Sequence, residues 1–252
     1  MSDPIGDLAD TVHVKSDQAE FRDYFRKWFV GILPALLDDT VVNHEILVLI
    51  GEQGLYKTTW FNFLLPPELR CYFYTKTNSD RLNKDDLFSL TEFALICFEE
   101  LDGMRPAELN QLKAMVTMPY VNERAAYGRN KERHPHIASF CGTGNNVQFL
   151  TDPTGNRRWL PFEVSQIRDP HLHAIPYELV YSQAYALWKS GFCHWFSQEE
   201  IRKLNMHNSR FEVPNLEEDL IRTHFRKPFE GEAGIFVTAA DILEQISSCL
   251  RY

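Results

Sequence analysis

An apolar stretch that runs straight into a glycine-containing loop constrains this chain more than any other feature. Residues 45–50, EILVLI, form a continuous apolar run of strand length that ends at Gly51. Such a run is typical of a strand buried on both faces of a parallel sheet. A helix is predicted from Lys57 and must stop at Pro66-Pro67, because proline cannot continue it. The sequence therefore predicts a strand, a tight loop and a helix in direct succession.

This loop has the parts of a phosphate-binding site. Such a site needs backbone N–H groups around the anion, a helix N-terminus, a lysine for the outer phosphates and a hydroxyl for Mg²⁺. Gly54 permits the tight turn, Lys57 supplies the ammonium and Thr58 supplies the hydroxyl. The pattern GxxxxGK[ST] has glycine before the lysine; here Tyr56 stands there, where we expect a backbone conformation that is costly for a residue with a side chain. The predicted nucleotide-binding residues are Gly51, Glu52, Gln53, Gly54, Leu55, Tyr56, Lys57, Thr58 and Thr59. An ordinary strand–turn–helix connection is the alternative.

A second buried run, residues 93–98, is followed by Glu99 and Glu100. Nucleotide hydrolysis needs one acid beside Mg²⁺ and another to activate water. We predict the metal role, shared with Thr58, for Glu99 and the general-base role for Glu100. Paired acids after a strand also occur as a solvated helix start, which is the alternative.

Two further polar groups follow a third buried run, residues 137–143. Asn145 or Asn146 would sense the γ-phosphate and orient water, although asparagines also favour simple turns. Arg157 and Arg158 share a predicted turn, and arginine is suited to stabilising a phosphoryl group in transfer, often from a neighbouring subunit. A surface pair bound to acids is the alternative for the arginines.

A predicted β-hairpin lies between the second and third buried runs, in residues 120–134. Its turn is basic, and Arg129, Lys131 and Arg133 are candidates for DNA binding, with tyrosines nearby for stacking on bases. A solvated charged loop explains the same residues equally well.

Composition limits the classes of function. The chain has 252 residues with 35 acidic and 26 basic side chains, so DNA contact requires a local basic patch. The five cysteines form no CxxC pair, and two lie in apolar runs, which favours buried free thiols. No apolar run approaches the roughly 20 residues of a membrane span, so we expect a soluble, cytoplasmic protein without membrane partners.

Buried strands alternating with helices predict an α/β fold with a mainly parallel central sheet. We predict an N-terminal helical segment (1–40), a P-loop NTPase core (41–170), a C-terminal helical part (171–230) and the start of a small, truncated domain (231–252). In the last part Thr238 is a predicted helix N-cap.

Taken together, GEQGLYKTTW, ICFEELD, LKAMVTMPYVNERAAYGR, FCGTGN and FLTDPTGNRRWLPFEV resemble the virulence-associated E family over roughly residues 40–170. These are helicase-like NTPases of phages, plasmids and other mobile elements, related to superfamily 3 and poxvirus-type primase-helicases. By resemblance, Lys57 and Thr58 match the Walker A pair, Glu99 and Glu100 the Walker B acids, and Asn145 the sensor. Arg157 and Arg158 match the arginine-finger region, and residues 120–134 the hairpin that faces a central pore.

The resemblance implies a three-layer, AAA+-like core that assembles into a ring, usually a hexamer. It implies ATP and Mg²⁺ as cofactors and single-stranded or forked DNA as a partner. It also implies a role in replication or mobilisation of a mobile element, together with a primase or another replication protein. The chain contains no evident primase module. A nucleotide-dependent adaptor without translocation is the competing prediction, supported by the negative net charge and by Tyr56. A small-molecule kinase is a weaker one, because no lid or acceptor signature is present.

Overall fold

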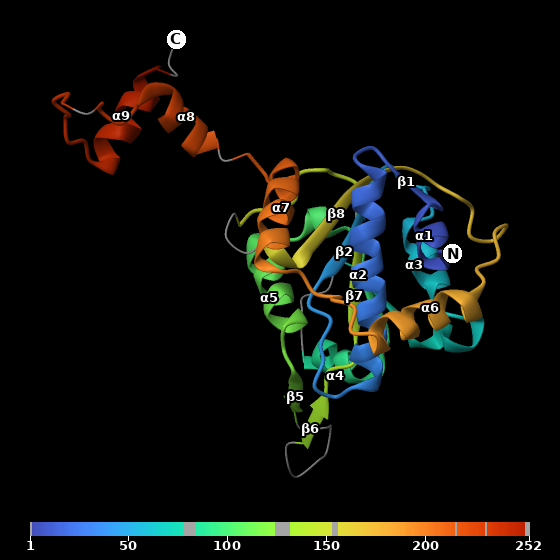
Figure 1. Ribbon diagram of the computed structural model, residues 1–252. Coiled ribbons are helices and arrows are strands. Elements are labelled where there is room, and N and C mark those ends of the chain that lie inside the picture. Colours follow the sequence, from blue (N-terminus) through green and yellow to red (C-terminus); the bar gives the residue numbers. More distant parts are fainter. Residues whose placement is uncertain are drawn as a thin grey trace. The chain divides into compact units, whose positions relative to one another are not determined.

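A mostly parallel six-stranded sheet forms the centre of the protein (Figure 1). The structure is a computed structural model that describes residues 2–77, 84–123, 132–152, 156–214, 216–229 and 231–249. The strand order is β1-β8-β2-β7-β4-β3, in which β1 runs antiparallel to β8 and the other neighbours are parallel. The strands are β1 (Val12–Val14), β2 (Ile46–Ile50), β3 (Phe73–Lys76), β4 (Leu95–Phe98), β7 (Ser139–Gly144) and β8 (Trp159–Ile167). The predicted α/β fold with a mainly parallel sheet is confirmed.

Helices cover both faces of the sheet. They are α1 (Pro4–Ala9), α2 (Gln18–Leu37), α3 (Lys57–Leu64), α4 (Lys84–Glu92), α5 (Pro106–Val116), α6 (Tyr177–Lys189) and α7 (Gln198–Asn208). Short 3₁₀ turns connect some of them: η1 (Pro67–Tyr72), η2 (Leu101–Gly103), η3 (Asn156–Arg158) and η4 (Ser209–Phe211). The paired strands β5 (Tyr120–Glu123) and β6 (Glu132–Pro135) form a separate antiparallel arm.

The central strand β2 shows how the two faces are filled. Leu47 and Leu49 belong to a core cluster with residues of α1, α2, α3 and α6, whereas Ile46, Val48 and Ile50 belong to a second cluster with residues of α4 and α5. This alternation follows from the two-residue period of a strand. All five residues are buried, which explains the unbroken apolar run in the sequence.

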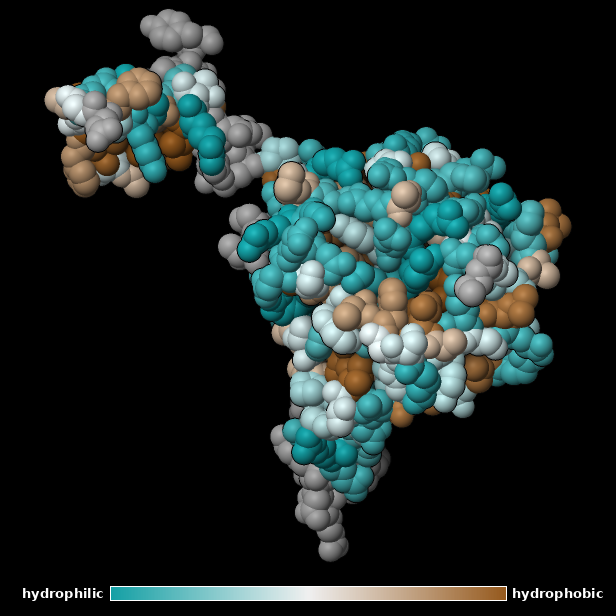
Figure 2. All heavy atoms as spheres, in the orientation of Figure 1, coloured by the Kyte–Doolittle hydropathy of each residue, from teal (hydrophilic) through white to brown (hydrophobic). Residues whose placement is uncertain are grey.

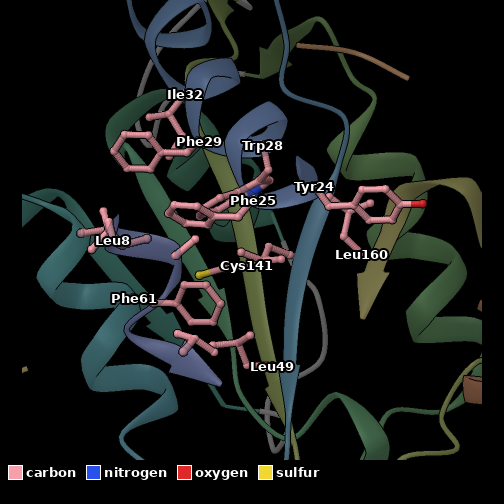
Figure 3. Packing of buried hydrophobic residues seen from close by; sticks show 14 of the residues in the cluster. Leu8, Tyr24, Phe25, Trp28, Phe29, Ile32, Leu49, Phe61, Cys141 and Leu160 are labelled. Atoms are coloured by element: carbon pink, nitrogen blue, oxygen red, sulfur yellow. The ribbon is translucent and has the colours of Figure 1, made fainter. Parts of the chain in front are cut away.

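Helix α2 is the largest contributor to the first cluster. Asp17 caps its N-terminus by accepting hydrogen bonds from the amides of Ala19 and Glu20, and its aromatic face packs on the sheet (Figure 3). The indole Nε1 of Trp28 donates to the Phe140 carbonyl of β7 at 2.8 Å, which satisfies a buried donor. The helix continues through Pro34 to Leu37, within the N-terminal segment 1–40 that was predicted to be helical.

The C-terminal end of α3 is held by side chains from other elements. The hydroxyl of Tyr177 donates to the Phe63 carbonyl at 2.8 Å, and that of Tyr181 donates to the Leu64 carbonyl at 2.9 Å. The last carbonyls of a helix have no partner within it, so these two bonds from α6 fix the end of α3.

Two strands and one helix were not predicted from the sequence. β1 lies within the segment predicted to be helical, β8 carries Pro161, and α4 lies in a part of the predicted core for which no element was predicted. Cys97 and Cys141 are buried thiols as predicted, whereas Cys71 and Cys193 are exposed, so burial does not hold for the whole set.

Contacts divide the chain into two units, Met1–Glu212 and Val213–Tyr252. In the second unit α8 (Leu216–His224) packs against α9 (Ala239–Cys249), and Thr238 caps α9 by accepting the Asp241 amide at 3.3 Å. The boundaries predicted at residues 40, 170 and 230 stay predictions.

Within the described residues, no helix combines the length and apolarity needed to cross a membrane. On the visible face of the first unit, polar residues dominate and apolar ones gather in small areas (Figure 2).

Candidate functional site

A pocket of about 450 Å³ lies at the carboxyl ends of β2, β4 and β7. Because these strands run parallel, their carboxyl ends share one edge of the sheet, where ligands bind in open α/β folds. The pocket therefore brings together the loop after β2, the acids after β4 and the polar turn after β7. Its lining residues are Gln53, Gly54, Leu55, Tyr56, Lys57, Thr58, Thr59, Glu99, Glu100, Thr143, Gly144 and Asn145.

The backbone of the loop is unusual at two points. Gly54 has φ 88° and Tyr56, the residue before α3, has φ 61°, in the left-handed region. Among the described residues Tyr56 and Glu100 are the two non-glycine residues with positive φ, and both line this pocket. Such conformations cost about 1–3 kcal/mol and cluster at functional sites. The ring of Tyr56 is 41% exposed, so it borders the pocket without being buried in it.

Lys57 is the best-connected residue of the loop. Its ammonium donates to the carbonyls of Gly51 at 2.5 Å and Glu52 at 2.8 Å, and to Asn145 Oδ1 at 3.3 Å. Burial lowers the pKa of Lys57, and the nearby charge of Asp102 acts in the opposite direction. Gly51 and Glu52 thus take part through their carbonyl oxygens, which hold the ammonium at the first turn of α3.

Thr58 and Glu99 provide oxygen atoms suited to a divalent cation. The Thr58 hydroxyl donates to Glu99 Oε1 at 2.7 Å, which joins the start of α3 to the end of β4. Mg²⁺ prefers such hard oxygen ligands and takes only one or two from the protein, completing its shell with phosphate and water. The described residues contain no group of three or more His, Cys, Asp or Glu side chains that would hold a metal alone. The pair fits Mg²⁺ bound together with a nucleotide.

The two candidate asparagines, Asn145 and Asn146, make different contacts in the turn after β7. Asn145 contacts Lys57 within the pocket, whereas Asn146 Oδ1 accepts the amide of Gln148 in its own turn at 3.2 Å. Of the two asparagines, Asn145 is therefore the one that lines the pocket.

Asp102 is a site residue that our sequence analysis missed. Its carboxylate accepts the amide of Asn145 at 3.2 Å and that of Asn146 at 3.0 Å. The only signal was its place in ICFEELD, two residues after Glu100, where it stands as a third acid behind a buried strand.

Arg157 and Arg158 lie at the other edge of the sheet. They directly precede β8, whose residues Trp159 to Glu163 pair with Ile46 to Ile50 of β2. Four residue steps along a strand span about 13 Å, so the arginines and the loop after β2 are at opposite ends of the same strand pair. The structure does not bring them to the pocket of their own chain.

The arginines border a second pocket of about 370 Å³. Burial, and then the charge of Arg157, lower the pKa of Arg158. Neither side chain forms an ion pair with any described residue, contrary to the alternative of a pair bound to acids. The pocket is lined by His44, Glu45, Thr117, Arg157, Arg158, Trp195, Phe196 and Ile201.

The predicted hairpin between the second and third buried runs is present as the arms β5 and β6. Arg133 lies with its guanidinium 3.5 Å from the ring centroid of Tyr120 on the opposite arm, a cation–π contact. Arg129 and Lys131 lie outside the described residues.

Replacing Tyr56 tests whether its left-handed backbone conformation lowers the stability of the fold. We expect Tyr56→Gly to leave the thermal unfolding midpoint unchanged or raise it by a few degrees, because glycine adopts positive φ without steric strain. Tyr56→Val should destabilise by about 1–3 kcal/mol, because a β-branched residue tolerates this region poorly. Thermal unfolding of the three proteins measures both effects, and equal midpoints for the two variants would show that the loop relaxes.

Three comparisons with known proteins place the chain among its relatives. A model of the virulence-associated protein E-like domain matches residues 3–213. A search of curated proteins found no significant match.

Two solved structures share the fold. One, the apo structure of the NrS-1 C-terminal region (305–718), has a TM-score of 0.50 at 13% identity, covering 98% of this chain and 62% of that one. The A form of the apo NrS-1 C-terminal region has a TM-score of 0.51 at 14% identity, covering 87% and 53%. This chain thus spans between half and two thirds of those structures, and at such identity the likeness concerns the fold alone.

The resemblance in the five sequence motifs and the match over most of the chain agree. The chain belongs to the virulence-associated protein E-like family.

Proposed function

We propose that this chain is a Mg²⁺-dependent P-loop ATPase with an AAA+-like core that powers a DNA helicase-like motor of a phage, plasmid or other mobile element. The observation that carries the proposal is the convergence of Lys57, the Thr58–Glu99 pair and Asn145 in one pocket. These groups come from three strand ends, with Lys57 and Thr58 after β2, Glu99 after β4 and Asn145 after β7, so their meeting is a property of the fold and not of one local turn.

The charges of the pocket favour a nucleotide that arrives with its cation. Its lining carries one ammonium, from Lys57, and two carboxylates, Glu99 and Glu100. A free triphosphate would meet repulsion from the acids, whereas a bound Mg²⁺ offsets it. Mg²⁺ held by Thr58 and Glu99 would neutralise charge on the outer phosphates.

The remaining groups fit the steps of hydrolysis. Lys57 binds the outer phosphates at the N-terminus of α3, where backbone amides also face the anion. Glu100 accepts a proton from the attacking water, and Asn145 orients that water against the γ-phosphate. Tyr56 borders the same space with its exposed ring.

A second copy of the chain completes the site in this proposal. Arg157 and Arg158 lie at the opposite edge of the sheet from their own pocket and lack acidic partners among the described residues. They can act on a nucleotide only if it is bound in the pocket of a neighbouring copy of the chain. A ring, such as a hexamer, repeats this contact around its circumference.

Removing the lysine tests the proposal directly. We expect Lys57→Ala to lower the ATPase rate by about 100-fold or more, because the site loses its phosphate-binding charge. A matched control is Lys203→Ala, which removes an exposed lysine of α7 and should keep normal activity. Steady-state phosphate release and the unfolding midpoint are measured for both. Wild-type turnover in a folded Lys57→Ala protein would rule out the assignment.

Mixing two inactive variants tests whether the site is shared between copies. Arg158→Ala keeps an intact phosphate loop, and Lys57→Ala keeps intact arginines, so mixed assemblies contain some complete sites. We expect part of the ATPase activity to return on mixing. A mixture of Lys57→Ala with the Lys57→Ala/Arg158→Ala double variant should stay inactive. Absence of recovery, with mixed assemblies present by sedimentation, contradicts an arginine in trans.

The second candidate function is a nucleotide-binding adaptor that does not translocate, favoured by the net charge of -9 and by Tyr56. Single-stranded DNA distinguishes the two. The motor proposal expects DNA to stimulate ATPase activity, and Arg133→Ala to weaken DNA binding by roughly fivefold or more through loss of charge beside Tyr120. Arg202→Ala, on an exposed part of α7, is the control. No stimulation, together with unchanged DNA binding in Arg133→Ala, favours the adaptor.

A further inference from the structure

Asp102 connects two parts of the pocket that the chain builds from different strands. It belongs to the short turn η2 that follows Glu100 at the end of β4, and its carboxylate reaches the turn at the end of β7. Its partners, the amides of Asn145 and Asn146, are 43 and 44 residues away along the chain.

These contacts differ from those of an ordinary turn-forming aspartate. Asp38, for example, accepts the amide of Thr40 two residues on, which stabilises only its own turn. The carboxylate of Asp102 instead accepts its two amide bonds from the turn after β7, so these bonds join the ends of two different strands. A carboxylate that accepts backbone N–H groups forms bonds roughly twice as strong as neutral ones.

Gly144, at the end of β7, leaves space for the carboxylate of Asp102. A Cβ added at Gly144 would lie 3.0 Å from Asp102 Oδ1, closer than ordinary contacts allow. Glycine at this position therefore permits the carboxylate to reach the two amides. The nearest functional group beyond them is the Asn145 side chain, whose Oδ1 accepts from Lys57 Nζ at 3.3 Å.

We propose that Asp102 is a positioning residue that holds the Asn145 side chain toward the γ-phosphate site and fixes it relative to the turn that carries Glu100. The inference rests on the proposed ATPase function. Asp102 acts through Asn145 and touches no reacting atom. Asp102 thereby keeps the Asn145 side chain at a fixed position relative to Glu100, because Glu100 directly precedes the turn η2 that contains Asp102.

Asp102→Asn is the sharpest variant, because it keeps the shape but replaces one acceptor oxygen with an NH₂ group. That group meets a backbone N–H, so one of the two bonds is lost. We expect kcat to fall about 10- to 100-fold, as for other groups that orient a functional side chain, with the KM for ATP within about threefold. Asp38→Asn is the matched control and should keep wild-type kcat.

A double-variant cycle tests the route of the effect. If Asp102 acts through Asn145, then Asp102→Asn should change kcat little once Asn145→Ala is present. Independent, multiplying effects of the two substitutions would overturn the proposal. A kcat for Asp102→Asn within twofold of wild type would also overturn it.

Hydrogen–deuterium exchange gives a readout that does not depend on activity. Asp102→Asn should speed exchange in the peptide covering residues 144–148, and Asp38→Asn should not. Unchanged exchange rejects the role of Asp102 in holding the turn. A wild-type protein that hydrolyses no ATP rejects the ATPase function alone, and exchange still decides whether Asp102 orders the turn. Should Asp102→Asn fail to fold, Asp102→Glu keeps the charge, displaces it by one methylene and is judged by the same outcomes.

Discussion

The parallel pairing of β2 with β7 on one side and β8 on the other is the interaction on which the rest of the structure depends. It buries all five residues of β2 and continues past the strand, where the Gly51 amide donates to the Gly144 carbonyl at 3.1 Å. That last bond joins the start of the loop to the end of β7. The backbone ladder thus places the loop after β2 and the turn after β7 side by side before any side chain contributes.

Hydrogen bonds to a buried ammonium shape the pocket that this ladder creates. Lys57 is buried, and burial by itself disfavours its charged ammonium form. The carbonyls of Gly51 and Glu52 accept hydrogen bonds from this ammonium and so offset part of that cost. Asp102 and the two glutamates add negative charge around it. The arrangement keeps an ammonium in place at a helix N-terminus, where cations are otherwise unfavourable.

The sequence predicted the parts of the site that depend on neighbours along the chain. The strand, the loop and Lys57 follow one another directly, and Glu99, Glu100 and Asn145 each follow a recognisable apolar run. Lys57, Glu99, Glu100 and Asn145 all line the pocket, because parallel strands align their carboxyl ends.

Features that arise from contacts between distant residues could not be predicted in this way. Asp102 acquires its partners from β7, and the position of the arginines depends on the register of β8 against β2. β8 was not predicted, and its Pro161 is a residue that argues against a central strand. Pro161 is tolerated since β1 pairs only with Val164 to Ile167, which leaves this part of β8 at an edge.

Both ends of α3 are fixed, and this has a mechanical consequence. The helix has eight residues, about 12 Å long, with the loop after β2 at its start and the Tyr177 and Tyr181 hydroxyls bonded to its last turn. The helix thus connects the pocket at the end of β2 to α6, and a displacement of the loop along the helix axis would reach the two tyrosine contacts.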